Sequence, residues 1–167
     1  PSPISTRACV WVVHPQHGQH CMSADLPAGK VFVDTNVLIY AYDIEAGSKH
    51  ERCHEILHTL WKTKSGIISI QVMQEFFVNV TRKIPRPLSV AKSKGILQAY
   101  LAWEIPPTQA DTVLLAVDIM ARHQLSFWDA MIIASATKGG AKTLLSEDMK
   151  HDQLIEGVRV LNPFMAP

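Results

Sequence analysis

Residues 30–40 read Lys-Val-Phe-Val-Asp-Thr-Asn-Val-Leu-Ile-Tyr, and this stretch decides the fold of the chain. The run from Val31 to Val33 is β-branched and aromatic without a polar interruption, which is typical of a strand buried on both faces of a parallel sheet. The run stops at Asp34, and Asn36 can then cap a helix that begins at Val37. We therefore expect Asp34 at the carboxyl end of a central strand, where open α/β sheets carry their ligand crevice.

Asp34 can be explained in two ways. An unpaired buried carboxylate is costly, so this side chain should either face a cleft or bind a cation. The alternative is an ordinary aspartate at the start of a helix, and this segment alone leaves both explanations open.

The composition fits one soluble globular domain, with 167 residues of which 47% are apolar. The net charge of +1 gives no global argument for a nucleic-acid partner, so local clustering must supply one. Cys9, Cys21 and Cys53 are odd in number and lack CxxC spacing, which favours a reduced, cytoplasmic protein without a disulfide framework. Because no apolar stretch is long enough to span a bilayer, we expect no membrane segment.

Residues 1–29 differ from the rest, and we interpret them as a flexible or non-native N-terminal extension. The spacing of His14, His17, His20 and Cys21 could hold a metal, but a tail without a native metal site is the favoured interpretation. A single globular domain is expected over residues 30–164, followed by a short tail at 165–167.

Strands and helices alternate after Val31, which predicts an α/β fold. Further strands are predicted at 66–70, 143–146 and 158–161, and helices at 49–62, 71–83 and 89–103. Capping boxes predict three helix starts: Ser48 with Glu51, Thr108 with Asp111, and Ser126 with Asp129. The last of these boxes explains Asp129 structurally, without any function. Another helix is expected to begin at Glu147 and Asp148.

Two helix faces can be read from the spacing of their residues. The apolar face of the helix that begins near Thr108 is predicted to consist of Val113, Leu114, Val117 and Met120. His50, His54 and His58 share one face of the helix at 49–62. Such a row could bind zinc, but a solvated or partner-facing stripe is the favoured interpretation.

The acidic residues gather at one predicted edge. Asp34 and Asp148 each follow an apolar strand, and Asp129 opens a helix, so all three belong at the carboxyl edge of a parallel sheet. Carboxylates that lie close together repel one another unless a divalent cation is present. Ligation by oxygen favours Mg²⁺ or Mn²⁺ over zinc, and such ions support phosphodiester cleavage.

A basic segment follows the helix that carries Glu75. No acidic residue occurs between Glu75 and Glu104, whereas Arg82, Lys83 and Arg86 do. These three are candidate contacts to the phosphates of a polyanionic substrate. A basic helix end, favoured by the helix dipole, explains Arg82 and Lys83 equally well.

The motifs together resemble the PIN-domain ribonucleases, with the closest likeness to VapC-like toxins of type II (VapBC) toxin–antitoxin pairs. The resemblance runs from about Lys30 to Phe164. It rests on Val-Asp-Thr-Asn-Val-Leu-Ile-Tyr at 33–40, Ser69 with Gln71 and Glu75, Phe-Trp-Asp-Ala-Met-Ile at 127–132, Leu-Leu-Ser-Glu-Asp-Met at 144–149 and Asn-Pro-Phe at 162–164.

This resemblance implies a three-layer α/β/α fold around a mainly parallel sheet and a Mg²⁺- or Mn²⁺-dependent endoribonuclease. The implied catalytic acids are Asp34, Glu75, Asp129 and Asp148. Asp34 and Asp129 are the implied metal ligands, with Glu75 and Asp148 as further candidates. Thr35, Asn36 and Ser146 are the implied polar residues beside the acids. The implied partners are an RNA substrate, a cognate antitoxin and a second copy of the chain.

Two alternatives stay open on the sequence alone. A phosphatase of the haloacid-dehalogenase type also places Asp after its first strand, but it needs a second Asp two residues later, where this chain has Asn36. The other alternative is a PIN domain that binds RNA without cleaving it.

Overall fold

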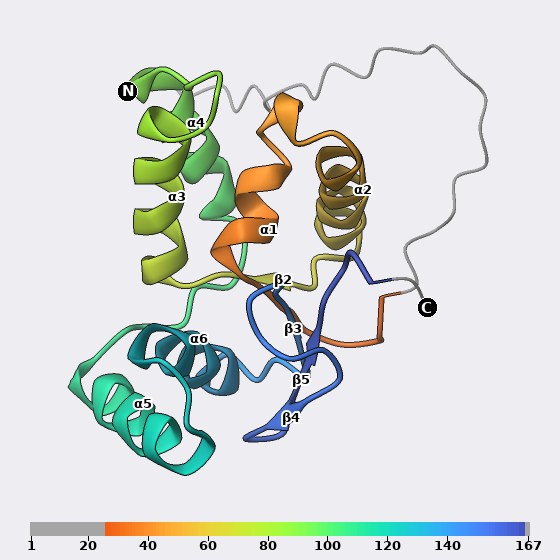
Figure 1. The fold of residues 1–167 in the computed structure, drawn as a ribbon. Coiled ribbons are helices and arrows are strands. Elements are labelled where there is room, and N and C mark those ends of the chain that lie inside the picture. The colour runs from red at the N-terminus through yellow and green to blue at the C-terminus, as the bar shows by residue number, and fades with distance from the viewer. Residues whose placement is uncertain (1–25, 166–167) are drawn as a thin grey trace, which may run out of the picture.

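In the computed structural model, which describes residues 26–165, five strands form one sheet in the order β2-β1-β3-β5-β4 (Figure 1). The strands are β1 (Val31–Val33), β2 (Gly66–Ile67), β3 (Thr143–Leu145), β4 (Leu154–Ile155) and β5 (Val158–Leu161). β1 pairs in parallel with β2 on one side and β3 on the other, while β4 pairs antiparallel with β5. The next strand along the chain, β2, lies on one side of β1, and the later strands lie on the other side, so the carboxyl ends of β1 and β3 form a topological switch point.

Helices cover both faces of this sheet. They are α1 (Thr35–Tyr40), η1 (Ile44–Ala46), α2 (Ser48–Thr63), α3 (Ile70–Arg82), α4 (Val90–Tyr100), α5 (Ala110–His123) and α6 (Phe127–Lys138). Figure 1 shows α5 and α6 together on the opposite side of the sheet from α1 and α2. The result is a three-layer α/β/α arrangement around a mostly parallel sheet, as the resemblance implied.

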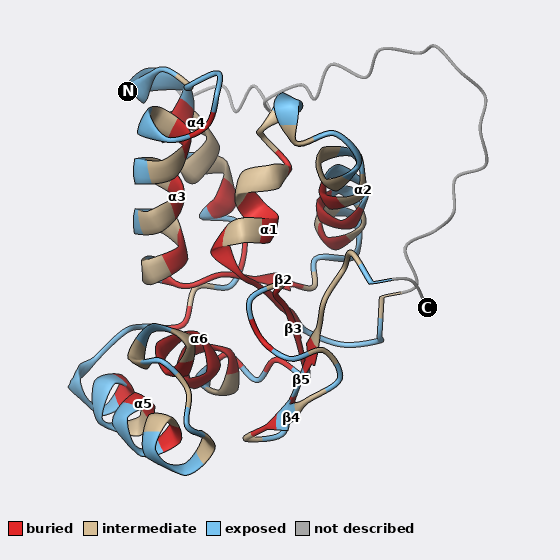
Figure 2. Cartoon of the chain, in the orientation of Figure 1, coloured by how far each residue is buried: buried red, intermediate tan, exposed pale blue. Residues whose placement is uncertain are grey.

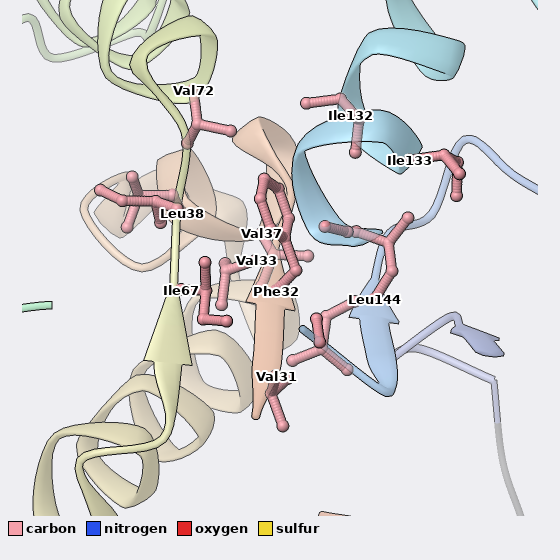
Figure 3. Close-up of a cluster of buried hydrophobic side chains, with 14 of the residues drawn as sticks. Val31, Phe32, Val33, Val37, Leu38, Ile67, Val72, Ile132, Ile133 and Leu144 are labelled. Atoms are coloured by element: carbon pink, nitrogen blue, oxygen red, sulfur yellow. The ribbon is translucent and has the colours of Figure 1, made fainter. Parts of the chain in front are cut away.

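The central strand is buried on both faces. Val31, Phe32 and Val33 are each no more than 1% exposed. Figure 3 shows them surrounded by side chains from β2, β3, α1, α3 and α6. Apolar side chains on both faces are what a central parallel strand requires, because helices cover both sides of it. This packing fixes the position of Asp34, the residue that follows β1.

Several predicted helix starts are wrong in detail. α1 begins at Thr35 with Asp34 as its N-cap, not at Val37 with Asn36. The N-cap of α2 is Gly47, which has no side chain, so Ser48 and Glu51 form no capping box there. α5 is capped by Gln109, one residue after the predicted Thr108, and no helix begins at residues 147–148. The caps of α3, α4 and α6 are Ser69, Ser89 and Ser126, and all three accept a backbone N–H hydrogen bond.

The predicted apolar face of α5 is also wrong. Leu114 is 67% exposed, and Val113 and Val117 are exposed as well, whereas Met120 is partly buried. The buried face consists of Thr112, Ala116 and Ile119 (Figure 2). α5 carries apolar residues on more than one side, so periodicity could not identify the side that packs against α6. Its outer apolar stripe therefore lies on the surface of the chain.

The ends of the chain lie largely outside the described part. Residues 1–25 and 166–167 are not described, so the predicted histidine and cysteine spacing at residues 14–21 lies outside the structure. Leu26 packs against the core. Cys53 is a buried free thiol. Within residues 26–165, no helix is both long and apolar enough to cross a membrane.

The contact between Gly66 and Trp103 gives a test of this packing. A Cβ at Gly66 would lie 2.4 Å from Cζ3 of the buried Trp103. Gly66→Ala should therefore lower the free energy of unfolding by roughly 1 to 3 kcal/mol, measured by urea denaturation. Gly95→Ala in α4 is the matched control, because a Cβ there meets nothing within 4 Å. That change should leave stability equal or raise it by up to about 1 kcal/mol. Equal changes in the free energy of unfolding for the two variants would contradict the close packing of Gly66 against Trp103.

Candidate functional site

Asp34 is held at both carboxylate oxygens. Its Oδ1 accepts a hydrogen bond from the backbone N–H of Thr35 at 2.7 Å, which makes it the N-cap of α1. Its Oδ2 accepts a hydrogen bond from the hydroxyl of Ser146 at 2.6 Å. The side chain is only 7% exposed. Asp34 thus combines the two explanations, because it is a helix-start aspartate and also a nearly buried carboxylate that needs charge compensation.

Ser146 connects the two central strands of the switch point. It follows β3 directly, is fully buried, and donates its hydroxyl hydrogen to Asp34 across the β1–β3 pair. The same oxygen accepts the backbone N–H of Asp148 at 3.2 Å. One oxygen of Asp148 in turn accepts a hydrogen bond from the Asn36 amide at 2.9 Å. Asp34 and Asp148 therefore belong to one hydrogen-bonded network.

Glu75 joins this network from α3. Its Oε2 accepts a hydrogen bond from the hydroxyl of Thr35 at 2.6 Å, and its Oε1 accepts one from the Gln71 amide at 2.9 Å. Gln71 lies one turn before Glu75 on the same helix face, so the helix itself supplies this donor. Three of the four predicted acids, together with Thr35, Asn36 and Ser146, are thus brought together. They come from β1 and α1, from α3, and from the segment after β3.

The charge of Asp34 is poorly compensated. Burial raises the pKa of Asp34 from 3.8 to about 6, and repulsion from Asp148 and Glu75 adds to the rise. The hydrogen bonds from Ser146 and the Thr35 N–H work in the opposite direction without cancelling the effect. A carboxylate in this state gains from any nearby positive charge, because a cation offsets both the lost hydration and the repulsion.

The donor set fits a divalent cation of the Mg²⁺ or Mn²⁺ type. Carboxylate oxygens are the ligands that these ions prefer, and Mg²⁺ commonly takes one or two protein carboxylates and keeps several waters. Within residues 26–165, no group of three or more His, Cys, Asp or Glu side chains lies close enough to hold an ion as the side chains stand. The fit therefore rests on the buried, repelled Asp34 and its neighbours Asp148 and Glu75.

Asp129 is not linked to the other acids by a hydrogen bond among the described residues. Its backbone N–H donates to the Ser126 hydroxyl oxygen at 3.1 Å, and its Oδ2 accepts from that hydroxyl at 2.8 Å. It lies in the first turn of α6, and Ser126 caps this helix as predicted, but the Asp129 carboxylate binds the Ser126 hydroxyl and not the Ser126 N–H, so only half of the predicted capping box is present. Its role in a metal site stays a prediction.

The predicted basic residues divide into two groups. Arg86 forms an ion pair with Glu45 at 2.6 Å, so its charge is already matched. Arg82 and Lys83 lie exposed at the end of α3, and no ion pair is recorded for them within residues 26–165. Their contact with RNA stays a prediction.

Further polar residues lie beside the acids, around Glu147, and sequence reasoning did not identify them. Glu147 accepts hydrogen bonds from the Tyr40 hydroxyl and from Lys49, whose Nζ lies 2.5 Å from Oε2. Lys49 and Glu147 are 98 residues apart, so no local pattern could join them. In the predicted histidine row, His50 contacts the Tyr40 carbonyl through Nδ1 and its ring lies 6.1 Å from that of His54.

Fold and site together define an α/β domain with an acidic centre at the carboxyl edge of a mostly parallel sheet. A family model for the PIN domain matches residues 31–156, and the chain belongs to the PIN-domain family. This match favours the PIN-domain interpretation over the haloacid-dehalogenase alternative. No curated protein sequence matches the chain.

Solved structures of similar fold come from several bacteria. A toxin–antitoxin complex from Klebsiella pneumoniae has 20% sequence identity and a TM-score of 0.60, with 82% of this chain and 100% of that chain covered. VapC20 of Mycobacterium tuberculosis, described as a sarcin-ricin loop cleaving toxin, has 20% identity, a TM-score of 0.53 and coverage of 69% and 87%. VapBC2 from Rickettsia felis, bound to a promoter DNA fragment, has 20% identity, a TM-score of 0.53 and coverage of 78% and 96%. At this identity the likeness concerns the fold.

The raised pKa of Asp34 predicts a pH-dependent cost that Asp34→Asn removes. The folded protein binds this proton more tightly than the unfolded chain, so the associated stability is present below pH 3.8 and is lost as the pH rises through about 6. Asn keeps an oxygen to cap α1 and carries no charge. At pH 7 the metal-free variant should therefore be more stable than wild type, on the order of 1 to 3 kcal/mol.

Urea denaturation at pH 5 and pH 7, with and without Mg²⁺, measures this difference. It should be smaller at pH 5 and should shrink again when Mg²⁺ is added, because an ion would neutralise the wild-type carboxylate. A variant less stable than wild type at pH 7 would show that Asp34 is an ordinary structural aspartate.

Proposed function

We propose that this chain is a divalent-metal-dependent endoribonuclease and the toxin of a toxin–antitoxin pair. The observation that carries the proposal is the network of Asp34, Glu75 and Asp148, which are joined through Thr35, Ser146 and Asn36 at the switch point of the sheet. Membership of the PIN-domain family and the solved structures described as toxins or toxin–antitoxin complexes support it.

The proposed ligands of the ion are Asp34 and Asp129, with Glu75 and Asp148 as further candidates. When bound, Mg²⁺ or Mn²⁺ would supply activation of water and stabilisation of the attacking and leaving oxygens of the phosphodiester. The chain's own donors orient the carboxylates: Ser146 and the Thr35 N–H hold Asp34, while the Thr35 hydroxyl and Gln71 hold Glu75. Each held oxygen keeps a further lone pair for an ion.

The proposal includes two protein partners, a cognate antitoxin and a second copy of the chain. Two of the similar structures are described as complexes of toxin with antitoxin, which supports the first. The exposed apolar stripe of α5, with Val113, Leu114 and Val117, is the kind of surface that a protein partner covers. It supports a protein partner without deciding which of the two binds there.

Substitution of the acids tests the enzymatic proposal. Asp34→Asn, Glu75→Gln and Asp148→Asn should each lower Mn²⁺-dependent cleavage of RNA by roughly 100-fold or more, because each removes a negative charge that would hold the cation in place for the reaction. Cleavage of a labelled RNA is followed on denaturing gels, with and without a chelator. Asp118→Asn is the matched control, since Asp118 is exposed on α5.

Two outcomes would contradict this assignment. Cleavage retained in all three variants would move the reaction to another site. A wild-type protein that retains RNA but never cleaves it, with any divalent ion, would favour the non-catalytic RNA-binding alternative.

The exposed basic residues give a separate test of RNA binding. Arg82→Ala with Lys83→Ala should weaken RNA affinity and reduce the slope of log K against log salt by about one unit per residue that contacts a phosphate. Arg86→Ala should change little, because Glu45 already matches its charge. Filter binding at several salt concentrations measures both. An unchanged slope in the double variant would place the phosphate contacts elsewhere, and Mn²⁺ binding should be unaffected in all of these variants.

A further inference from the structure

The ammonium group of Lys49 has both polar and aromatic contacts beside the acidic network. Its Nζ donates a hydrogen bond to Glu147 Oε2 at 2.5 Å and another to the Tyr40 hydroxyl oxygen at 3.3 Å. It also lies 4.6 Å from the centre of the Tyr40 ring and 4.9 Å from that of the Phe164 ring. The two rings meet edge to face at 5.6 Å. The ammonium group is therefore held by residues from α1, the segment after β3, and the C-terminal segment.

Glu147 is the carboxylate that receives these contacts. Its Oε1 accepts the Tyr40 hydroxyl and its Oε2 accepts Lys49, so both oxygens have donors. Its side chain is only 19% exposed. The hydrogen bond to Glu147 raises the pKa of Lys49, which keeps the ammonium charged. Lys49 and Glu147 thus form a partly buried ion pair, and Tyr40 is a second donor to the carboxylate, which distinguishes it from a pair of mobile surface charges.

Three consecutive residues after β3 are fixed by side-chain contacts. Ser146 binds Asp34, Glu147 binds Tyr40 and Lys49, and Asp148 binds Asn36. Asn36 and Tyr40 lie one turn apart on α1, so one helix face holds both Glu147 and Asp148. Residues 146–152 form neither helix nor strand. Backbone hydrogen bonds to β5 hold Ser146 and Asp152 at the two ends of this segment, whereas Asp148 between them is held by the Ser146 hydroxyl and the Asn36 amide.

We propose that Lys49, acting through Glu147, is a positioning residue that holds Asp148 in place for the divalent cation. The inference rests on the proposed function, and it adds a residue of α2 to the site. Residues that orient metal ligands from outside commonly change metal affinity by 10- to 100-fold when they are replaced.

The sign of the effect on metal affinity separates this role from simple electrostatics. Lys49→Met removes a positive charge near several carboxylates, so Coulomb's law alone predicts tighter binding of a divalent cation. Loss of positioning predicts weaker binding. Tyr40→Phe adds a second, charge-neutral variant, because it removes only the hydroxyl that donates to Glu147.

Calorimetric titration of the full chain with Mn²⁺ tests the proposal. Lys49→Met should weaken Mn²⁺ binding by roughly tenfold or more, Tyr40→Phe should weaken it in the same direction, and Lys49→Arg should restore most of the affinity. Lys62→Met, an exposed lysine on the same helix, should leave the affinity unchanged. If Lys49→Met fails to fold, Tyr40→Phe and Lys49→Arg still decide. Unchanged or tighter Mn²⁺ binding in Lys49→Met, or unchanged binding in Tyr40→Phe, would overturn the proposal.

A double variant identifies the route of the effect. If Lys49 acts only through Glu147, then Lys49→Met with Glu147→Gln should bind Mn²⁺ no more weakly than the worse single variant. RNA affinity without metal should be unchanged in Lys49→Met, so that the loss of cleavage falls on kcat and not on KM. Weaker metal-free RNA binding with a lower salt slope would mean that Lys49 contacts phosphate directly, which overturns the positioning role.

Measurements on the wild-type protein distinguish the proposed function from the positioning role of Lys49. If the wild-type protein binds Mn²⁺ in a manner that depends on Lys49 but cleaves no RNA, the proposed function fails and the positioning role stands. If it cleaves RNA but its Mn²⁺ affinity is insensitive to Lys49 and Tyr40, the positioning role fails and the function stands. If it binds no Mn²⁺ at all, the positioning role is overturned.

Discussion

The hydrogen bond from Ser146 to Asp34 is the interaction on which the site depends. It joins the residue that follows β1 to the residue that follows β3, at the switch point where the order of the strands changes direction. A hydrogen bond to a charged acceptor is stronger than one between neutral groups, and this one offsets part of the cost of burying the carboxylate. Because the Ser146 oxygen also accepts the backbone N–H of Asp148, one hydroxyl group contacts both of these acidic residues.

The hydrogen bond from Ser146 does not remove the electrostatic cost of burying Asp34, and packing elsewhere in the fold offsets that cost. Asp34 keeps a pKa of about 6 despite two hydrogen bonds, because burial and two carboxylates act against its charge. The apolar packing of β1 against helices on both faces holds Asp34 where it would not stay by itself. The fold thus stores unfavourable electrostatic energy at the sheet edge, and binding of a cation would release it. This is a physical reason for a metal site to be preorganised.

Local sequence signals predicted an element correctly where a short stretch of residues determines its own structure. The buried run at 31–33 predicted the central strand, and Ser126 predicted the cap of α6. Prediction failed where two patterns competed, as at Asp34, which caps α1 in place of Asn36, and on α5, which has apolar residues on several sides. The Lys49–Glu147 pair was beyond reach, since only the folded chain brings α2 to the segment after β3.

Two of the acids serve structure and proposed function at once, which affects how substitutions must be interpreted. Asp34 caps α1, and Asp129 lies in the first turn of α6 with its carboxylate on the capping Ser126. A negative charge near a helix N-terminus is favourable, so part of the cost of each charge is met locally. Replacement by Ala would remove the cap and the charge together. Replacement of Asp34 by Asn keeps an acceptor oxygen for the cap and removes the charge, while an amide NH₂ takes the place of the oxygen that accepts from Ser146. Asn therefore separates helix capping from the charge of the site better than Ala does.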